Sequence, residues 1–599
     1  MNGITKSITF LKEYKQLKQA VDEGKTPVLA VGLSAIHKAH LAAALGLDTD
    51  RPVLVLTDDD NAANRFAADL RGFSERDIVQ LPSRELVMAD VVGVSRGYEQ
   101  RRLAALDELT EAHFAVASVQ AAAQRTMPPE ALKAAIVSLA TGETAPLDEL
   151  AQSLTRAGYE RCVQVEGTGQ FSIRGGILDV FPPQAEHPYR VEFWDDEIDS
   201  ISTFDVGSQR RLEQCECLRC LPCMESIPAL AKGGAAGLAK AVLALTSTRR
   251  KKQHADLQTN LERDAERLRE TGSLPAADKY MPLIYPEMAT AFDYLPENAI
   301  VIIEDTPRLR DAVRDFHARV ADDVTALLER GEMPPALGEY ALDFVGVCGV
   351  KRQILRLDSF LNNVAELTPQ HLENFIANQM NAYGGNLDMA SADIRSYTEQ
   401  GRAVAVVCGS ALRCQNMLDA LTDTGLNVKI SDLLPKGGCV NIMEGTLSAG
   451  FEYPDLGLVV MTEGQVLARR KKTQVKKSNR DKVKSYTDLT PGDLVVHEHH
   501  GIGRFIGMER MTVDGSERDF IKIAFAGTDF LYVPGNLARP HLQIYRRRRQ
   551  RARAAEQARR RGLEQGESTR QSGCKGAGRG SHQAVCRARQ GQGLRLPAG

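Results

Sequence analysis

The stretch from Asp493 to Pro534 reads DLVVHEHHGIGRFIGMERMTVDGSERDFIKIAFAGTDFLYVP. Apolar residues partly alternate along it, which predicts short, half-buried strands. Asp514-Gly515 divides two of these strands, and Asp-Gly is a dipeptide that favours tight hairpin turns. A segment of this length and pattern suits a small twisted β-barrel. Such a barrel is too small for a catalytic cleft and is suited to holding a partner.

Strand and helix patterns alternate at the other end of the chain. The strand-like segments are short and apolar, and helix-like segments recur between them. This alternation predicts βαβ units and a parallel sheet, so the expected fold class is α/β. The expected strands are 27–32, 52–57, 78–81 and 115–118, and the expected helices are 36–45, 62–70 and 95–109.

The pattern changes further along the chain. A helix is expected at 147–157, and the sequence beyond it is rich in β-forming residues with Gly and Pro turns. A further α/β unit follows, with strands expected at 403–408 and 458–461 and a helix at 411–421. The expected parts are an α/β domain formed by 1–125 and 212–345, a β-rich insert at 126–211, a further α/β domain at 346–465, a basic linker at 466–485, the barrel at 486–540 and a tail at 541–599.

The net charge of −3 hides an uneven distribution. Residues 546–599 hold 15 Lys/Arg and 3 Asp/Glu, so this tail carries +12 and the rest of the chain −15. The tail is poor in large apolar residues and cannot bury enough surface to offset the entropy cost of ordering. We expect either a disordered basic tail or an out-of-frame translation that begins near 536–545.

A second basic run, 469–484, precedes the barrel and holds nine Lys/Arg and one Asp. Such charge runs are usually solvated, flexible chain, which suits a linker. Transient contact with DNA is the alternative, because clustered cations attract phosphates without sequence preference. No apolar window is long enough for a membrane span, and eleven irregularly spaced cysteines fit reduced thiols, so we expect a cytoplasmic location.

The turn after the first expected strand matches a phosphate-binding loop only in part. The pattern GxxxxGK[ST] falls on residues 32–39, where Gly32 and Lys38 fit. His37 replaces the second glycine, and Ala39 replaces the hydroxyl residue that would hold Mg²⁺. Phosphoryl transfer needs the phosphate cradle and the metal together, so we expect no cofactor and no ATP hydrolysis here.

Glu304 and Asp305 follow an apolar strand, as the acids of a Walker B strand do. They are therefore candidates for the same degenerate nucleotide site. The alternative is ordinary acids beside a helix start, because Thr306 and Pro307 suit the first turn of a helix.

Two clusters invite a metal interpretation, and we expect no metal at either. Four cysteines form CxCxxCxxC at 215–223, but a strand with small apolar Cys positions explains them equally well. The run His497-Glu498-His499-His500 holds ligand types, yet adjacent strand positions point to opposite faces.

Long strings in the chain resemble a known family. Within the barrel stretch, 495–505 (VVHEHHGIGRF) and 521–534 (IKIAFAGTDFLYVP) resemble the RNA-polymerase-interacting domain shared by transcription-repair coupling factors and CarD-type regulators. Upstream, the module resembles that of the repair helicase UvrB. The strings that carry this second resemblance are LPSRELVMADVVGVSRGYEQRRL at 81–103, RGGILDVFP at 174–182 and YRVEFWDDEIDSISTFD at 189–205.

The resemblance implies an architecture and two sets of contact residues. It implies a UvrB-like α/β module with the insert, a further α/β domain and an SH3- or Tudor-like barrel. UvrA would be bound through Arg174, Arg190 and Trp194 of the insert. Trp194 would lie on the polar face of its strand, although packing in a local core is the alternative. The β subunit of RNA polymerase would be bound through His497, Glu498, His499, Gly501, Arg504 and Phe505.

The function implied is transcription-coupled nucleotide-excision repair. The family couples RNA polymerase stalled at damage to the recruitment of UvrA, and its full-length members are DNA translocases that use ATP and Mg²⁺ on double-stranded DNA. We expect this chain, a monomer without a complete phosphate loop, to bind partners and not to translocate. The alternatives are a UvrB-like helicase and a CarD-like transcription regulator.

Overall fold

The computed structural model forms two units, 1–469 and 470–599. No helix among the described residues is long and apolar enough to cross a membrane. The structure describes residues 2–88, 96–245, 255–334, 337, 339–380, 382–433, 437–467, 494–497, 501–513, 516–524, 530–534 and 542–545.

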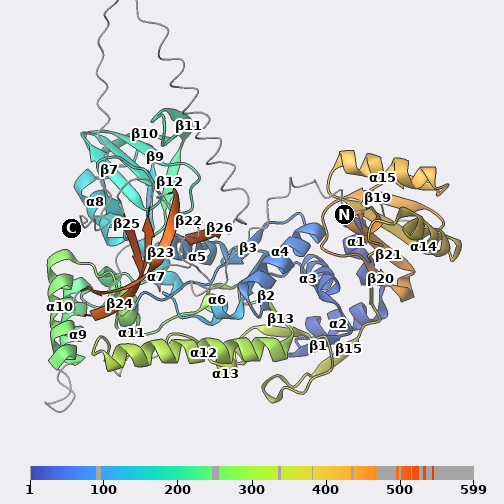
Figure 1. Cartoon of the computed structure of the whole chain (residues 1–599), viewed down its shortest axis with the longest axis horizontal. Coiled ribbons are helices and arrows are strands. Elements are labelled where there is room, and N and C mark those ends of the chain that lie inside the picture. Colours follow the sequence, from blue (N-terminus) through green and yellow to red (C-terminus); the bar gives the residue numbers. More distant parts are fainter. Residues whose placement is uncertain are drawn as a thin grey trace, which may run out of the picture. The chain divides into compact units, whose positions relative to one another are not determined.

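A seven-stranded parallel sheet forms the centre of the first α/β domain (Figure 1). Its strand order is β15-β1-β14-β13-β2-β4-β3, which confirms the predicted βαβ organisation. The strands are β1 (Val28–Val31), β2 (Val53–Thr57), β3 (Ile78–Leu81), β4 (Phe114–Ser118), β13 (Ile300–Glu304), β14 (Gln353–Leu357) and β15 (His371–Asn374). Strands such as β2 are buried along their whole length because apolar clusters cover both faces of the sheet.

Helices connect and cover these strands. Asp59 caps α4 by accepting a hydrogen bond from the backbone of Ala62, which explains why the helix begins there. The helices of this domain are α1 (Asn2–Ser7), α2 (Lys12–Asp22), α3 (Ala35–Thr49), α4 (Asp60–Phe73), α5 (Gly97–Glu108), α6 (Val119–Ala123), α7 (Pro129–Ala135), α9 (Gly234–Ala244), α10 (Ala255–Thr271), α11 (Met281–Ile284), α12 (Thr306–Glu329) and α13 (Phe344–Cys348).

The start expected for the further α/β domain, residue 346, is too early. β14 pairs with β13 and β1, and β15 pairs with the outer side of β1, so both strands belong to the first sheet. The sequence could not show this, because the partners of β15 lie more than 300 residues away along the chain.

The insert is a six-stranded sheet with the order β11-β10-β9-β8-β7-β6. Its strands are β6 (Glu160–Arg161), β7 (Gln170–Arg174), β8 (Ile177–Phe181), β9 (Tyr189–Trp194), β10 (Glu197–Phe204) and β11 (Arg211–Cys215). One face packs with α8 (Leu147–Arg156) in a compact apolar cluster. A separate pair, β5 (Val137–Ala140) with β12 (Cys217–Cys220), extends the β-rich region past residue 211.

The further α/β domain has a mixed sheet with the order β16-β20-β21-β17-β19-β18. The expected strands at 403–408 and 458–461 and the expected helix at 411–421 are confirmed as β17, β21 and α15. The elements are β16 (Asn378–Gln379), β17 (Ala403–Cys408), β18 (Val428–Ile430), β19 (Val440–Glu444), β20 (Phe451–Tyr453), β21 (Leu458–Thr462), α14 (Leu387–Glu399), α15 (Ala411–Asp423) and α16 (Glu463–Val466). One face of this sheet shares an apolar cluster with α3 and α4 of the first domain.

The second unit contains an antiparallel sheet with the order β25-β24-β23-β22-β26. Its strands are β22 (Leu494–His497), β23 (Gly501–Val513), β24 (Ser516–Ala524), β25 (Phe530–Pro534) and β26 (Leu542–Tyr545). Val513 pairs with Ser516, so β23 and β24 form the hairpin that Asp514-Gly515 predicted. The strands continue to residue 545, past the limit of 540 expected for this domain.

Candidate partner-binding site

The three residues expected to bind UvrA lie on one face of the insert's sheet. Arg190 and Trp194 occupy alternate positions of β9, and Arg174 ends β7. Trp194 is 81% exposed, so its packing in a local core is excluded. Val191, from the intervening positions of β9, is buried in the apolar cluster on the opposite face.

The strand that carries Trp194 ends at that residue. Trp194 pairs with Glu197, and Asp195 has a φ of 59° in the turn between β9 and β10. The turn therefore begins one residue after Trp194 and holds the indole at the end of a hairpin. Asp195 and Asp196 lie in this turn.

Arg174 and Arg190 meet at a carboxylate that the sequence did not single out. Asp179, in β8, pairs directly across from Arg190 in the sheet, and its side chain is 1% exposed. Its oxygens accept a hydrogen bond from Arg174 Nη2 at 2.6 Å and two from Arg190, from Nε at 2.7 Å and Nη2 at 2.9 Å. The hydrogen bond with Asp179 raises the pKa of Arg190. The two arginines are therefore held together by a shared buried partner.

Glu192 separates this group from Trp194 on the same strand face. Glu192 accepts a hydrogen bond from Ser200 at 3.0 Å and forms an ion pair with Arg211. The positions of β9 on this face are thus polar up to the exposed indole at the end of the strand. A polar, partly exposed surface with an aromatic anchor is typical of a transient protein interface.

The turn that was compared with a phosphate loop is closed by other parts of the chain. Gly32 has a φ of 84°, and a Cβ at this position would overlap the carbonyl oxygen of Phe375. Lys38 lies in α3 with its side chain 4% exposed, 3.9 Å from a carboxylate oxygen of Glu304. Ala39 is fully buried. The lysine is thus held by a buried acid, and no hydroxyl stands at position 39.

The acids after β13 are brought to this turn by the parallel sheet. Burial raises the pKa of Glu304. Asp305, with a φ of 61°, precedes α12 and accepts a hydrogen bond from Ser359 at 3.1 Å. Lys38 Nζ lies 3.5 Å from the same Ser359 hydroxyl. The structure thus brings Lys38, Glu304 and Asp305 together in a compact polar group, in which Ser359 is exposed.

His37, in place of the second glycine, packs against the further α/β domain. Its ring lies 5.4 Å from that of Phe451 and 5.1 Å from that of Tyr453, both edge-on. Burial lowers the pKa of His37 to about 4. On the next turn of α3, His40 stacks on Phe73 at 4.7 Å. This end of α3 thus packs at the contact between the first and the further α/β domains.

The cysteine cluster lies on strands and their continuation. Cys215 ends β11, Cys217 and Cys220 belong to β12, and Cys217 is exposed while Cys220 is buried. Burial raises the pKa of Cys220 to about 12 and also raises that of Cys223. A raised thiol pKa opposes the thiolate form that metals bind. The arrangement is that of small apolar residues in a strand.

The residues expected to bind polymerase fall partly within the described strands. His497 ends β22 and pairs with Gly501, the first residue of β23. Arg504 and Phe505 follow in β23, and the Arg504 side chain is exposed. Glu498 and His499 lie outside the described residues, as do 468–485 of the basic linker, 486–493 at the start of the expected barrel and the tail from 546.

Sequence reasoning missed a buried cluster of charged residues behind the loop 82–88. Arg84 Nη1 contacts Asp278 at 2.6 Å, and Arg84 Nε contacts Glu225 at 2.8 Å. Arg102 Nε contacts the same Glu225 oxygen at 3.1 Å. The available signal was Glu99 and Arg102, two charges three residues apart on the buried side of α5.

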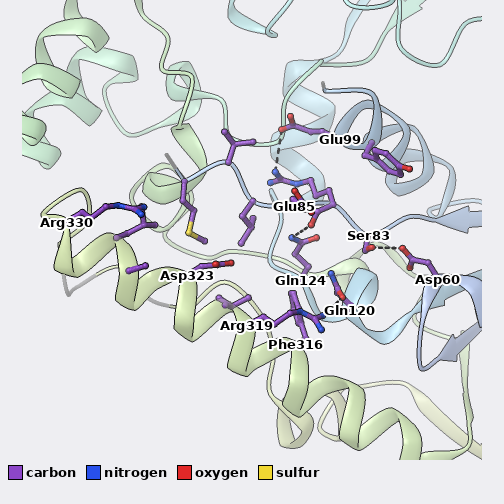
Figure 2. A pocket seen from close by; sticks show the side chains of 18 residues that line it. Asp60, Ser83, Glu85, Glu99, Gln120, Gln124, Phe316, Arg319, Asp323 and Arg330 are labelled. Atoms are coloured by element: carbon purple, nitrogen blue, oxygen red, sulfur yellow. Dashed lines mark hydrogen bonds and ion pairs between the residues drawn. The ribbon is translucent and has the colours of Figure 1, made fainter. Parts of the chain in front are cut away.

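The loop 83–88 and α12 line an open pocket of about 1000 Å³ (Figure 2). Gln124 lies in its wall and donates a hydrogen bond to the carbonyl oxygen of Arg84 at 3.0 Å. Figure 2 shows Arg319 and Asp323 on α12, across the cavity from that loop. Its lining mixes both charge signs with apolar side chains, a composition that indicates no particular ligand class.

Two family models match the chain. One, described as the UvrB interaction domain, matches 137–225, and the other, described as the CarD-like/TRCF RID domain, matches 489–545. The first match starts and ends later than the insert expected at 126–211, and the pairing of β12 with β5 accounts for this extent.

Curated relatives match most of this chain. The transcription-repair-coupling factor of Bacillus subtilis (strain 168) is 31% identical over 547 residues, which cover 88% of this chain and 46% of the relative. Those of Staphylococcus epidermidis (RP62A) and Staphylococcus aureus (USA300) are 26% identical, covering 86% and 88% of this chain and 45% and 46% of the relatives. The chain spans about half the length of the curated relatives it matches. Over this shared length the chain is similar to the transcription-repair-coupling factors, and it contains segments that match the UvrB interaction domain and the CarD-like/TRCF RID domain.

Proposed function

We propose that this chain is a two-site adaptor of transcription-coupled nucleotide-excision repair, which binds UvrA and RNA polymerase. The exposed Trp194, on the same sheet face as Arg174 within the UvrB interaction domain, is the observation that carries the UvrA contact. An exposed indole and a half-exposed arginine on one sheet face supply the residue types that dominate binding energy at interfaces.

The polymerase contact is assigned to the second unit. The match to the CarD-like/TRCF RID domain and the register of β22 with β23 support it. The proposed target is the β subunit, reached in part through a strand edge. This chain matches about half the length of its curated relatives. For a protein of that full length we propose recruitment of UvrA to stalled polymerase, ATP-driven polymerase release, binding of double-stranded DNA and a cytoplasmic location.

The β1–α3 turn is proposed to have no part in ATP hydrolysis. Support comes from the closure of Gly32 by Phe375, the buried Lys38–Glu304 contact and the alanine at position 39. The purified chain should therefore show no DNA-stimulated ATP turnover that depends on Lys38. Turnover that Lys38→Ala abolishes, in a variant with unchanged circular dichroism, would contradict this assignment.

A two-partner capture experiment tests the adaptor. Immobilised chain is incubated with purified UvrA, with purified polymerase β subunit, or with both. We expect each to bind alone and both to bind together. A UvrB-like helicase predicts UvrA only, and a CarD-like regulator predicts polymerase only. Trp194→Ala should weaken UvrA capture and leave polymerase capture unchanged, which makes the second partner the internal control.

A further inference from the structure

The two arginines that contact Asp179 differ in how many hydrogen-bond donors remain available to a partner. The Arg190 side chain is 15% exposed, and its guanidinium carbon lies 4.5 Å above the centre of the Phe204 ring. Besides Asp179, Arg190 contacts Gln209 through Nη1 at 3.4 Å and Nη2 at 3.3 Å. Four of the five N–H donors of Arg190 are therefore used inside the domain.

Arg174 is more exposed than Arg190 and makes fewer contacts within the domain. Its side chain is 49% exposed, and only its Nη2 is engaged, by Asp179. Within the part of the chain that the structure describes, no other hydrogen bond or ion pair is recorded for this guanidinium. Its Nε and Nη1 groups can therefore donate hydrogen bonds to a partner carboxylate while Nη2 stays anchored.

The carboxylate of Asp179 holds the side chains of both Arg174 and Arg190 in place. Arg190 takes both of its oxygens, and Arg174 shares the second, Oδ2. A long side chain held in one geometry before binding loses less rotational freedom on binding. The buried carboxylate can therefore contribute to affinity without touching the partner.

We propose that Asp179 is a positioning residue, that Arg174 is the arginine that contacts UvrA, and that Arg190 influences binding only by orienting Asp179 and Arg174. This inference rests on the proposed UvrA binding. Trp194 lies beyond Glu192, which is tied to Ser200 and Arg211, so its contribution is independent of the Asp179 group.

A double-mutant cycle in the full chain tests this arrangement, with the dissociation constant for UvrA measured by biolayer interferometry. Arg174→Gln should weaken binding by about tenfold, the order expected for one charge-assisted contact. Arg190→Lys keeps the charge but loses the bidentate fork, and it should weaken binding several-fold in the parent chain. In the Arg174→Gln background it should have no further effect. Multiplied effects of the two substitutions would show that Arg190 contacts UvrA itself and would overturn the inference.

Controls separate positioning from loss of structure. The losses of UvrA affinity caused by Arg174→Gln and by Trp194→Ala should multiply in the double variant, because these two contacts are independent. Glu192→Gln, which breaks a different pair on the same face, should change affinity by less than about twofold. If Arg190→Lys lowers the melting temperature, Asp179→Asn takes its place in the cycle. Asp179→Asn should likewise cause no further loss of UvrA affinity in the Arg174→Gln background. An additive result there, or no effect of either substitution in the parent chain, overturns the inference. Failure of the unmodified chain to bind UvrA would instead refute the proposed function.

Discussion

Replacing His40 by glutamine should remove a defined part of the acid sensitivity of the first unit. His40 is fully buried on α3; its Nδ1 lies 3.1 Å from the Tyr453 hydroxyl and its Nε2 3.0 Å from the carbonyl oxygens of Ile4 and Thr5. These contacts suit a neutral ring that donates from Nε2 and accepts at Nδ1. Burial lowers the pKa of His40 to about 3.

The sign of the effect follows from this lowered pKa. As the pH falls below the ordinary value of 6.5, the unfolded state takes up the proton while folded His40 stays neutral. The stability that His40 contributes is therefore complete above that pH and is lost progressively toward pH 3. Between pH 7 and pH 5 the loss is about 2 kcal/mol for this one residue. A glutamine can donate and accept in the same directions but does not titrate.

Urea unfolding followed by circular dichroism, at pH 7 and pH 5, measures the effect. The parent chain should lose about 2 kcal/mol more between the two pH values than His40→Gln does. Buried acids with a raised pKa, such as Glu304 and Asp69, oppose this trend, but they are present in both proteins and cancel in the difference. His37→Gln should behave similarly, because its pKa is about 4. Equal pH dependence in the parent chain and His40→Gln would refute the reasoning.

Three further substitutions address other parts of the first unit. Gly32→Ala should lower stability by at least about 2 kcal/mol in thermal unfolding, because of its positive φ and the overlap with a carbonyl oxygen; an unchanged melting temperature would mean that this turn is open. Trp194→Ala should leave the melting temperature unchanged, because the indole is 81% exposed, while calorimetry should show weaker UvrA binding; equal affinity would remove Trp194 from the interface. Glu225→Gln should cost about 3–5 kcal/mol in urea unfolding, because it leaves the buried charges of Arg84 and Arg102 poorly compensated; a loss within 0.5 kcal/mol, typical of surface changes, would contradict this.

Local patterns predicted the first sheet well and its edges poorly. The strand–helix alternation over 27–118 is confirmed because each of these segments carries its own apolar period and turn signals. β14 and β15 were assigned to the wrong domain because nothing in their sequence indicates a partner at β1, far away along the chain. Pairing of distant strands depends on the packed sheet and not on local composition.

The candidate site shows the same division. Alternation along β9 correctly placed Trp194 on the polar, outward face of its strand. It could not show that Arg190 is engaged within the domain while Arg174 remains half exposed, because that difference depends on Asp179, Phe204 and Gln209 from other strands and turns.

By itself, the sequence determined the α/β class, the hairpin of β23 and β24, the loss of the phosphate-loop residues and the place of Trp194 on the polar face of its strand, because each depends on residues close together in the chain. The tertiary structure decided the boundaries between the α/β domains and the packing of His37 and His40 at the contact between them. It also decided that Arg174 and Arg190 share the carboxylate of Asp179. Those features arise where side chains from distant segments lose water together, and the energy of a buried charge or ring depends on neighbours that local sequence does not specify.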